Sequence, residues 1–236
     1  MFPIRDDQPS FSTPFVNYFI IGLNAIVFLF EQSVEFENPR AFVALMYEFG
    51  VVPRHVTHAL GGEQFSLAAA FLPMLTSMFL HAGWMHVIGN MWFLWIFGDN
   101  VEDHLGHFKY LLFYLICGFA AAITHIVLNP GSSLPTVGAS GAISGVMGAY
   151  LLLYPRAKVL TLVVLIVFFT FWWLPAWIFL GYWFLLQFLT GAQTIGQTGQ
   201  ATGGIAVWAH VGGFVAGVVL IKLFPRRARS YRYGSW

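Results

Sequence analysis

Long apolar runs separated by short polar segments dominate this sequence. Apolar runs approaching about 20 residues are typical of helices that cross the hydrocarbon core of a membrane. The runs lie at about residues 15–30, 84–97, 110–128, 140–155, 174–189 and 207–224. We therefore predict an all-α polytopic membrane protein with six transmembrane helices.

The segment between the first two predicted spans, residues 31–82, is long and mixed in polarity. Its most apolar part, residues 65–80, is interrupted by Pro73. Short amphipathic pieces that lie in the membrane interface explain this pattern better than a further full crossing. We therefore expect a long first outer loop.

The positions of the basic residues orient the predicted spans. With the N-terminus inside, nine Lys and Arg lie inside and only Arg40 and Arg54 lie outside, which accounts for all 11. This distribution agrees with the excess of positive charge in cytoplasmic loops. The expected organisation is a cytoplasmic N-terminal segment (1–14), a six-helix membrane domain (15–224) and a basic cytoplasmic tail (225–236).

Residues 156–191 form a long, largely apolar stretch of 36 residues that a hydropathy window would split into two spans. As one helix it would be roughly 54 Å long, too long for one straight crossing and nearly enough for two. Two crossings would place the basic tail outside, against the charge bias. We therefore predict one crossing, at about 174–189, with Pro175 marking the break. Residues 159–171 are expected to dip into the inner interface or to run as an irregular segment packed on protein.

Composition supports a membrane protein and excludes several other classes. Hydrophobic residues make up 58% of the 236 residues and charged residues 9%, whereas soluble domains carry about 25% charged residues. The net charge of +1 gives no indication of a nucleic-acid partner. The single cysteine, Cys117, excludes an internal disulfide and a cysteine-based metal site, and its apolar surroundings indicate a buried, inert thiol.

The motif around Ser140 is the first candidate for chemistry. Gly138 and Gly141 flank this serine where a loop enters the fourth apolar run. Glycine lets backbone approach a ligand closely, and a helix N-terminus favours developing negative charge. Serine at a helix start is more often a cap than a nucleophile. The other polar residues of the chain are therefore needed to distinguish these two roles.

Polar side chains inside membrane spans are costly and therefore imply a role. His81, His86 and Asn90 lie near the start of the second span. His86 and Asn90 are four residues apart, so they share one helix face. Hydrogen bonding between helices is the alternative explanation for this pair.

His210 lies at the start of the sixth span and is followed by Gly213 and Gly217. Small residues four apart let another helix approach closely. The fourth span offers a matching surface, and a close contact would bring His210 near Ser140. A nucleophile, a base and two hydrogen-bond donors at one depth would form an acyl-transfer site. The small residues of the fourth span are Gly141, Gly145 and Gly148.

These motifs together resemble those of the rhomboid intramembrane serine proteases, over about residues 75–220. Gly138-Ala139-Ser140-Gly141 resembles the family motif GxSG. His81, His86 and Asn90 match the family pattern HxxxxHxxxN of the second span. His210, Gly213 and Gly217 match the pattern HxxGxxxG of the sixth span. Glu102, Gly106 and Tyr110 fit a structural pattern of the family between the second and third spans. The resemblance implies a rhomboid-like bundle of six helices.

The resemblance also implies the roles of the site residues. Ser140 would attack the scissile carbonyl, and His210 would take its proton and later give it to the leaving amine. His86, Asn90 and the backbone N–H of Ser140 would hold the oxyanion, and His81 would support the loop structure. The implied activity is serine-type endopeptidase cleavage of transmembrane protein substrates in the lipid bilayer, without a metal or other cofactor.

Two positions depart from patterns found in members of the family. The Trp-Arg pair of the first outer loop is missing, because Thr76-Ser77-Met78-Phe79 stands before His81. A tyrosine that stacks on the histidine in some members is replaced by Ser144. The base therefore has to be oriented by another group.

Other classes fit the sequence less well. An intramembrane metalloprotease would need His-Glu-x-x-His, which is absent, and an aspartyl protease would need two carboxylates inside spans. A transporter is also a poorer fit, because the sequence has no acidic residue at mid-membrane and no visible internal repeat. The serious alternative is a catalytically silent rhomboid-like protein that binds membrane clients, although such relatives typically lack the serine or the histidine.

The expected location is a bacterial inner membrane with both termini in the cytoplasm, and the sequence sets no oligomeric state. Residues 191–204, rich in Gly, Gln and Thr, precede the span that carries His210. We expect this stretch to be flexible and to form, with the fifth span, a gate beside the site.

Overall fold

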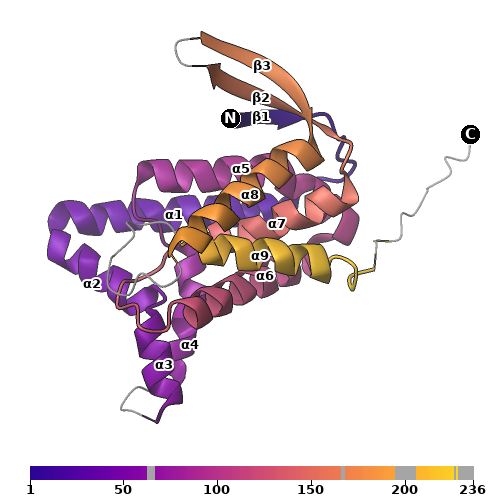
Figure 1. Ribbon diagram of the computed structural model, residues 1–236. Coiled ribbons are helices and arrows are strands. Elements are labelled where there is room, and N and C mark those ends of the chain that lie inside the picture. Colours follow the sequence, from indigo (N-terminus) through magenta and orange to yellow (C-terminus); the bar gives the residue numbers. More distant parts are fainter. Residues whose placement is uncertain (63–66, 166–167, 195–205, 226, 228–236) are drawn as a thin grey trace, which may run out of the picture.

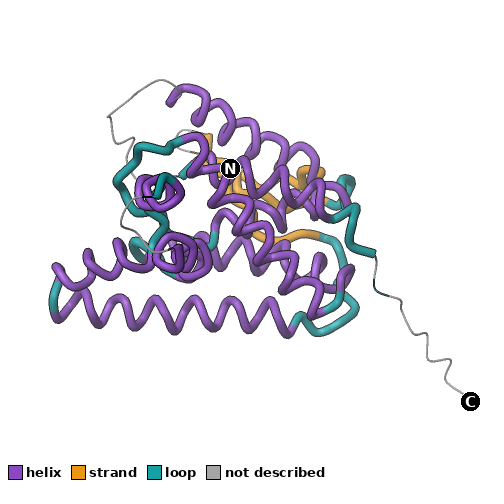
Figure 2. The backbone as a smooth tube through the Cα atoms, turned by 90° about the horizontal axis from the view of Figure 1, so that it is seen from below, coloured by secondary structure: helices purple, strands orange, loops and turns teal. Residues whose placement is uncertain are grey.

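The computed structural model describes residues 1–62, 67–165, 168–194, 206–225 and 227. Long helices lie side by side in one bundle, with a small sheet against one side of it (Figure 1). In the view from below, the strands lie behind the helices (Figure 2). The long helices are α1 (Phe15–Glu37), α5 (Trp84–Leu105), α6 (His107–Leu128), α7 (Ser140–Leu153), α8 (Ala176–Thr194) and α9 (Val207–Leu220).

Helix α7 lies at the centre of the bundle. It contacts α5, α6, α8 and α9, and every residue from Gly141 to Tyr150 is buried. A helix that is apolar all round requires such a central position. The core around it contains fully buried aromatic side chains from three helices: Phe97, Tyr110, Phe113, Tyr114 and Tyr150.

Helices α7 and α9 pack backbone against backbone. A Cβ added at Gly217 would overlap the carbonyl oxygen of Gly145, and one added at Gly213 would overlap that of Gly141. The predicted close contact between these two helices is therefore confirmed. Cys117 of α6 is buried and lies against Gly145, in agreement with an inert thiol.

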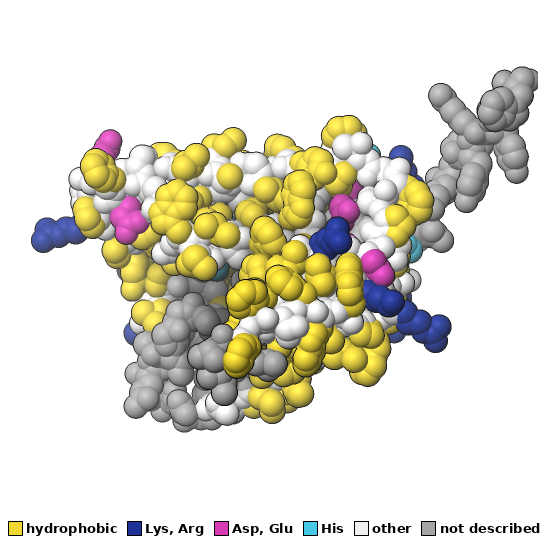
Figure 3. Space-filling model, turned by 90° about the horizontal axis from the view of Figure 1, so that it is seen from above, with side chains coloured by type: hydrophobic (Ala, Val, Ile, Leu, Met, Phe, Trp, Pro, Cys, Tyr) yellow, Lys and Arg dark blue, Asp and Glu magenta, His cyan; other side chains and the backbone are white. Residues whose placement is uncertain are grey.

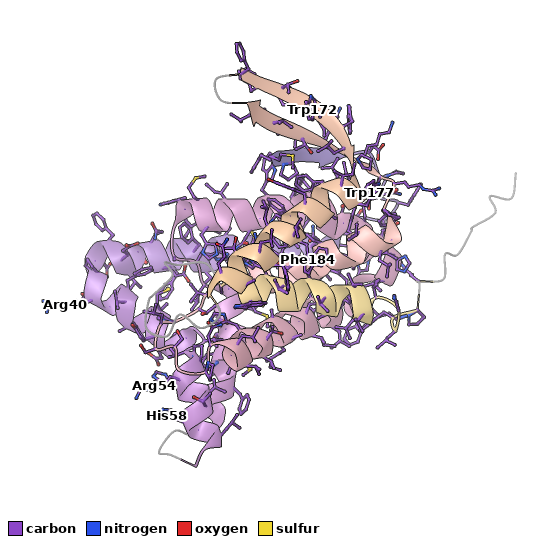
Figure 4. All side chains as sticks on the ribbon, in the orientation of Figure 1. Arg40, Arg54, His58, Trp172, Trp177 and Phe184 are labelled. Carbon is purple, nitrogen blue, oxygen red and sulfur yellow. The ribbon has the colours of Figure 1, made fainter. Side chains whose placement is uncertain are left out.

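Short helices fill the connection between α1 and α5, as the mixed polarity of that segment predicts. They are α2 (Pro39–Phe49), α3 (Pro53–Leu60), α4 (Leu67–Thr76) and the 3-10 turn η1 (Ser77–Phe79). The pair formed by 70–79 and α5 is bent by 80°. Asn38 caps α2 by accepting the backbone N–H groups of Arg40 and Ala41. Arg40, Arg54 and His58 project from this end of the molecule (Figure 4).

A three-stranded antiparallel sheet extends the fold beyond the predicted all-α class. Its order is β1 (Phe2–Asp6), β2 (Lys158–Leu165) and β3 (Phe168–Pro175). The region expected to be irregular or interfacial is thus a β-hairpin, because its β-branched and aromatic residues favour strands. Pro175 ends β3 and α8 begins at the next residue, so the predicted break at this proline is confirmed.

The N-terminal segment is bound to the bundle through β1 and the residues that follow it. The indole N–H of Trp92 donates to the Pro3 carbonyl at 2.7 Å. The hydroxyl of Tyr150 donates to the Asp6 carboxylate, and burial raises the pKa of Asp6 to about 6. Asp7 accepts the backbone N–H of Lys158 at 2.7 Å.

The outer surface is largely apolar, as expected of a membrane protein. Hydrophobic side chains are spread across the face seen from above, and few charged side chains are visible there (Figure 3). By length and composition, α1 and α6 each qualify as membrane spans, and 70–79 together with α5 qualifies as one bent span. Helices α7 and α9 are shorter apolar helices.

The acidic end of α5 binds the start of α1. Glu102 is fully buried and accepts the backbone N–H groups of Val16 at 3.0 Å and Asn17 at 2.7 Å. A carboxylate is favourable there because the first N–H groups of a helix lack internal partners. Asp103 accepts the Ser12 hydroxyl at 2.7 Å. The start of α1 and the segment before it are thus bound to the C-terminal end of α5.

The glycine contact predicts unequal effects of two identical substitutions. Gly217→Ala should destabilise the fold by about 1–3 kcal/mol, because the added methyl group forces α7 and α9 apart. Gly181→Ala is the matched control, since a Cβ there meets nothing within 4 Å. Thermal unfolding in detergent measures both variants. Equal melting temperatures for the two would contradict the importance of this contact.

Candidate active site

Ser140 is the first residue of α7 and lies where a loop enters the helix. Ala139 occupies the N-cap position and makes no side-chain cap. The Ser140 hydroxyl instead lies 2.8 Å from Nε2 of His210. The geometry therefore differs from that of a capping serine and is that of a hydroxyl facing a base.

His210 lies in the first turn of α9. Its Nε2 faces Ser140, and its Nδ1 lies 2.8 Å from Oε1 of Gln187 on α8. The ring of Trp183, one turn before Gln187, lies with its centroid 5.8 Å from that of the imidazole at an angle of 38°. Both nitrogens of the imidazole are thus within hydrogen-bond distance of a side-chain oxygen.

Gly138 lets the loop before Ser140 approach α5. Its φ of +127° suits glycine, and a Cβ there would lie 2.7 Å from Cε1 and Nε2 of His86. The backbone N–H of Gly138 donates to the Ser77 carbonyl at 2.8 Å. The loop is therefore held against the face of α5 that carries His86 and Asn90.

His86 and Asn90 present hydrogen-bond donors to this region. Nδ1 of His86 accepts the backbone N–H of Ala82 at 3.4 Å, which leaves the proton of a neutral imidazole on Nε2. Asn90 is 8% exposed, and its Nδ2 has no hydrogen-bond partner among the described residues. An unpaired buried donor is costly unless a ligand group accepts from it.

A cavity of about 820 Å³ connects these groups. It is large enough for a peptide segment, and its walls are mostly apolar with a few polar groups, as in many ligand sites. Ser140, His210, His86 and Asn90 all line it. The apolar lining includes Met78, Phe93, Ala121, Ile143, Met147 and Trp183.

The other predicted site residues lie around the cavity or at the far end of the bundle. Gly141 lines the cavity, and Gly213 and Gly217 form the contact between α7 and α9. His81 is fully buried; its backbone N–H donates to the Glu31 carboxylate at 3.1 Å, and its ring lies 5.0 Å from that of His86. That placement agrees with loop support. Glu102 lies at the opposite end of α5 from His86.

The sequence analysis did not identify three residues near His210: Gln187, Trp183 and His125. Gln187 had a detectable signal, because it is the only amide side chain between Ala176 and Leu189 of α8. His125, in the last turn of α6, lines the cavity, and its Nε2 lies 3.0 Å from the Thr136 hydroxyl.

No group of three or more His, Cys, Asp and Glu side chains that could hold a metal ion occurs in the part of the chain that the structure describes.

Comparison with known proteins gives one consistent family. The family model for the rhomboid domain matches residues 68–227, well over half of the chain. Rhomboid-like protein 11, chloroplastic, from Arabidopsis thaliana is 30% identical over 166 residues, which are 66% of this chain and 54% of that protein. Rhomboid protease GluP from Bacillus subtilis (strain 168) is 39% identical over 95 residues, which are 39% of this chain and 18% of that protein.

The chain spans about half or less of the length of these curated relatives, one of which is named a protease and the other rhomboid-like. The matched region contains α5, α6, α7 and α9, and thus every side chain that the sequence analysis placed in the site. This integral membrane protein belongs to the rhomboid family.

Proposed function

We propose that the protein is an intramembrane serine endopeptidase that cleaves transmembrane segments of other membrane proteins through a Ser140–His210 dyad. The observation that carries the proposal is the 2.8 Å approach of the Ser140 hydroxyl to Nε2 of His210 at the wall of the cavity. Two further donor-bearing side chains, His86 and Asn90, line the same cavity. The named protease among the relatives agrees with this reaction class.

The proposed reaction proceeds through an acyl-enzyme. Oγ of Ser140 bonds to the scissile carbonyl carbon while Nε2 of His210 takes the hydroxyl proton. The carbon–nitrogen bond then breaks, and the imidazolium gives this proton to the leaving amine. Water attacks the resulting ester, with His210 as the base, and releases a carboxyl product and free Ser140. Atoms and protons balance over the cycle without a co-reactant other than water.

Oxyanion stabilisation is assigned to three donors. They are the backbone N–H of Ser140, Nε2–H of His86 and Nδ2 of Asn90. The first lies at the N-terminus of α7, where the helix dipole favours negative charge. Donors held in place in a cavity with mostly apolar walls stabilise developing charge strongly, because they need no reorganisation during the reaction. This arrangement would favour the tetrahedral intermediate over the planar substrate.

The proposed topology has six crossings, by α1, α5, α6, α7, α8 and α9, with both termini in the cytoplasm of a bacterial-type cell and a long outer loop after α1. Antiparallel pairing of Lys158 with Pro175 supports a single crossing by α8, since the hairpin returns the chain to its starting point. Arg40 and Arg54 lie at the end where α2 and α3 gather (Figure 4). The position of both arginines at this end supports the orientation proposed for the spans.

The second candidate is a catalytically silent rhomboid-like protein that binds membrane clients. The rhomboid-like names among the relatives leave this class open. The presence of Ser140 and His210 at hydrogen-bond distance favours the protease. Covalent labelling of the purified protein with a fluorophosphonate probe separates the two, because only an activated serine reacts.

Substitution of either member of the dyad should abolish both cleavage and labelling. Ser140→Ala, His210→Ala and the double variant should lose activity to nearly the same extent, because the two groups act as a unit. His58→Ala on α3 is the control and should remain active. Cleavage of a model transmembrane substrate in proteoliposomes is the measurement. Substantial turnover by either single variant would exclude the dyad.

Loss of one oxyanion donor should slow the reaction without eliminating it. Asn90→Ala is expected to lower kcat by about 10²–10³-fold, the usual effect of removing one such donor, with little change in KM. Asn129→Ala, in the loop after α6, is the matched control. An unchanged kcat for Asn90→Ala would show that its amide does not contact the developing charge.

The two ends of the β2–β3–α8 segment should be accessible from opposite sides of the membrane. Single cysteines at Lys158 and Gln193, in a Cys117→Ala background, should react with a membrane-impermeant maleimide from the inner and outer side, respectively. Sealed vesicles of known orientation provide the measurement. Reaction of both from the same side would refute the six-span topology and, with it, the placement of His210 beside Ser140.

A further inference from the structure

Gln187 is a polar side chain in an otherwise apolar part of α8. It is the only amide between Ala176 and Leu189, and its Oε1 lies 2.8 Å from Nδ1 of His210. Polar side chains in membrane helices are costly and usually have a functional partner. Here the partner is the proposed catalytic base.

We infer that Gln187 is a positioning residue that fixes the tautomer and the orientation of His210. This inference rests on the proposed function. A neutral imidazole carries one proton, and its other nitrogen accepts. If the amide oxygen accepts Nδ1–H, Nε2 is left unprotonated and free to take the Ser140 proton. The two 2.8 Å contacts at opposite sides of the ring fit this tautomer.

Trp183 completes the support from α8. Residues 183 and 187 are four apart and therefore lie on one helix face. The centroid of the indole ring lies 5.8 Å from that of the His210 imidazole. The indole therefore restricts rotation of the imidazole, while the Gln187 amide holds its Nδ1 edge. On α7, the hydroxyl of Ser144 is used elsewhere, because it donates to the Ser140 carbonyl at 2.6 Å. The orientation of His210 thus comes from α8.

Packing between α8 and α9 holds this arrangement. The rings of Phe184 and Phe214 stack with centroids 4.7 Å apart, and Phe184 lies where α8 crosses α9 (Figure 4). A Cβ at Gly191 would lie 3.0 Å from the Trp208 ring. Contacts on both sides of Gln187 therefore set the rotation of α8 about its axis, which directs the amide toward His210.

The electrostatic surroundings of His210 make the role of Gln187 measurable. The titratable side chains that act on His210 are His86 on α5 and His125 on α6. No carboxylate of the described residues is among them. The amide supplies an acceptor without a full charge, so replacing it by a carboxylate should change the protonation of His210 in a defined direction.

Two substitutions at one position test the inference. Gln187→Met keeps the length of the side chain and removes the acceptor, so kcat and the rate of Ser140 labelling should fall at least tenfold while KM stays unchanged. Gln187→Glu keeps an acceptor and adds a charge. It should retain activity at high pH, and the acid limb of its pH–rate profile should move upward, because a nearby carboxylate raises the pKa of an imidazole by about 1–3 units.

Gln193→Met, at the other amide of α8, is the matched control and should match the parent protein. Wild-type kcat and labelling by Gln187→Met would overturn the inference, and so would an unmoved acid limb in Gln187→Glu. A Gln187→Glu variant that is inactive at every pH beside an active Gln187→Met would also overturn it, because activity would then not depend on an acceptor at this position.

The same experiment separates this inference from the proposed function. If the parent protein is not labelled at Ser140, or if Ser140→Ala is labelled equally, the protease proposal fails. If labelling depends on Ser140 and Gln187→Met behaves as the parent, only the positioning role fails. Thermal unfolding of each variant in detergent distinguishes loss of fold from loss of orientation.

Discussion

Direct backbone contact between α7 and α9 is the constraint on which the geometry of the site depends. Lipid does not drive helices together through the hydrophobic effect, so close packing and polar contacts have to hold them. Gly213 and Gly217 have no side chains, so α9 can lie directly against the backbone of α7 at Gly141 and Gly145. The contact begins in the first turns of α7 and α9, which carry Ser140 and His210. It therefore holds the Ser140 hydroxyl and the His210 imidazole at the same height in the bundle.

Helix α5 transmits a second constraint from the opposite end of the bundle. Glu102, near its C-terminus, accepts two backbone N–H groups at the start of α1, and buried polar groups are stable only when paired in this way. His86 and Asn90 lie near the N-terminus of the same helix. A rigid helix fixed at one end by Glu102 and packed on α7 therefore presents both side chains to the cavity at a defined height.

The fold and the site were predictable to different extents. Apolar runs and glycine spacing predicted the starts of α1, α5, α7 and α9 at the residues where the structure has them, because both signals belong to a single helix and its immediate partner. The β2–β3 hairpin was not predicted. An almost wholly apolar stretch shows neither the alternation of a half-buried strand nor the period of a helix. Its form depends on pairing with β1, in which Phe2 lies opposite Leu162, more than 150 residues away in the sequence.

Gln187 illustrates why the remaining chemistry was not apparent from spacing. An isolated amide in an apolar helix has to find a partner, and the sequence shows that the amide exists but not which way it points. Its direction depends on the rotation of α8, which the stacking of Phe184 on Phe214 and the contact of Gly191 with Trp208 set. A side chain on an otherwise apolar helix can therefore reach the site through packing between helices, as Gln187 of α8 reaches Nδ1 of His210.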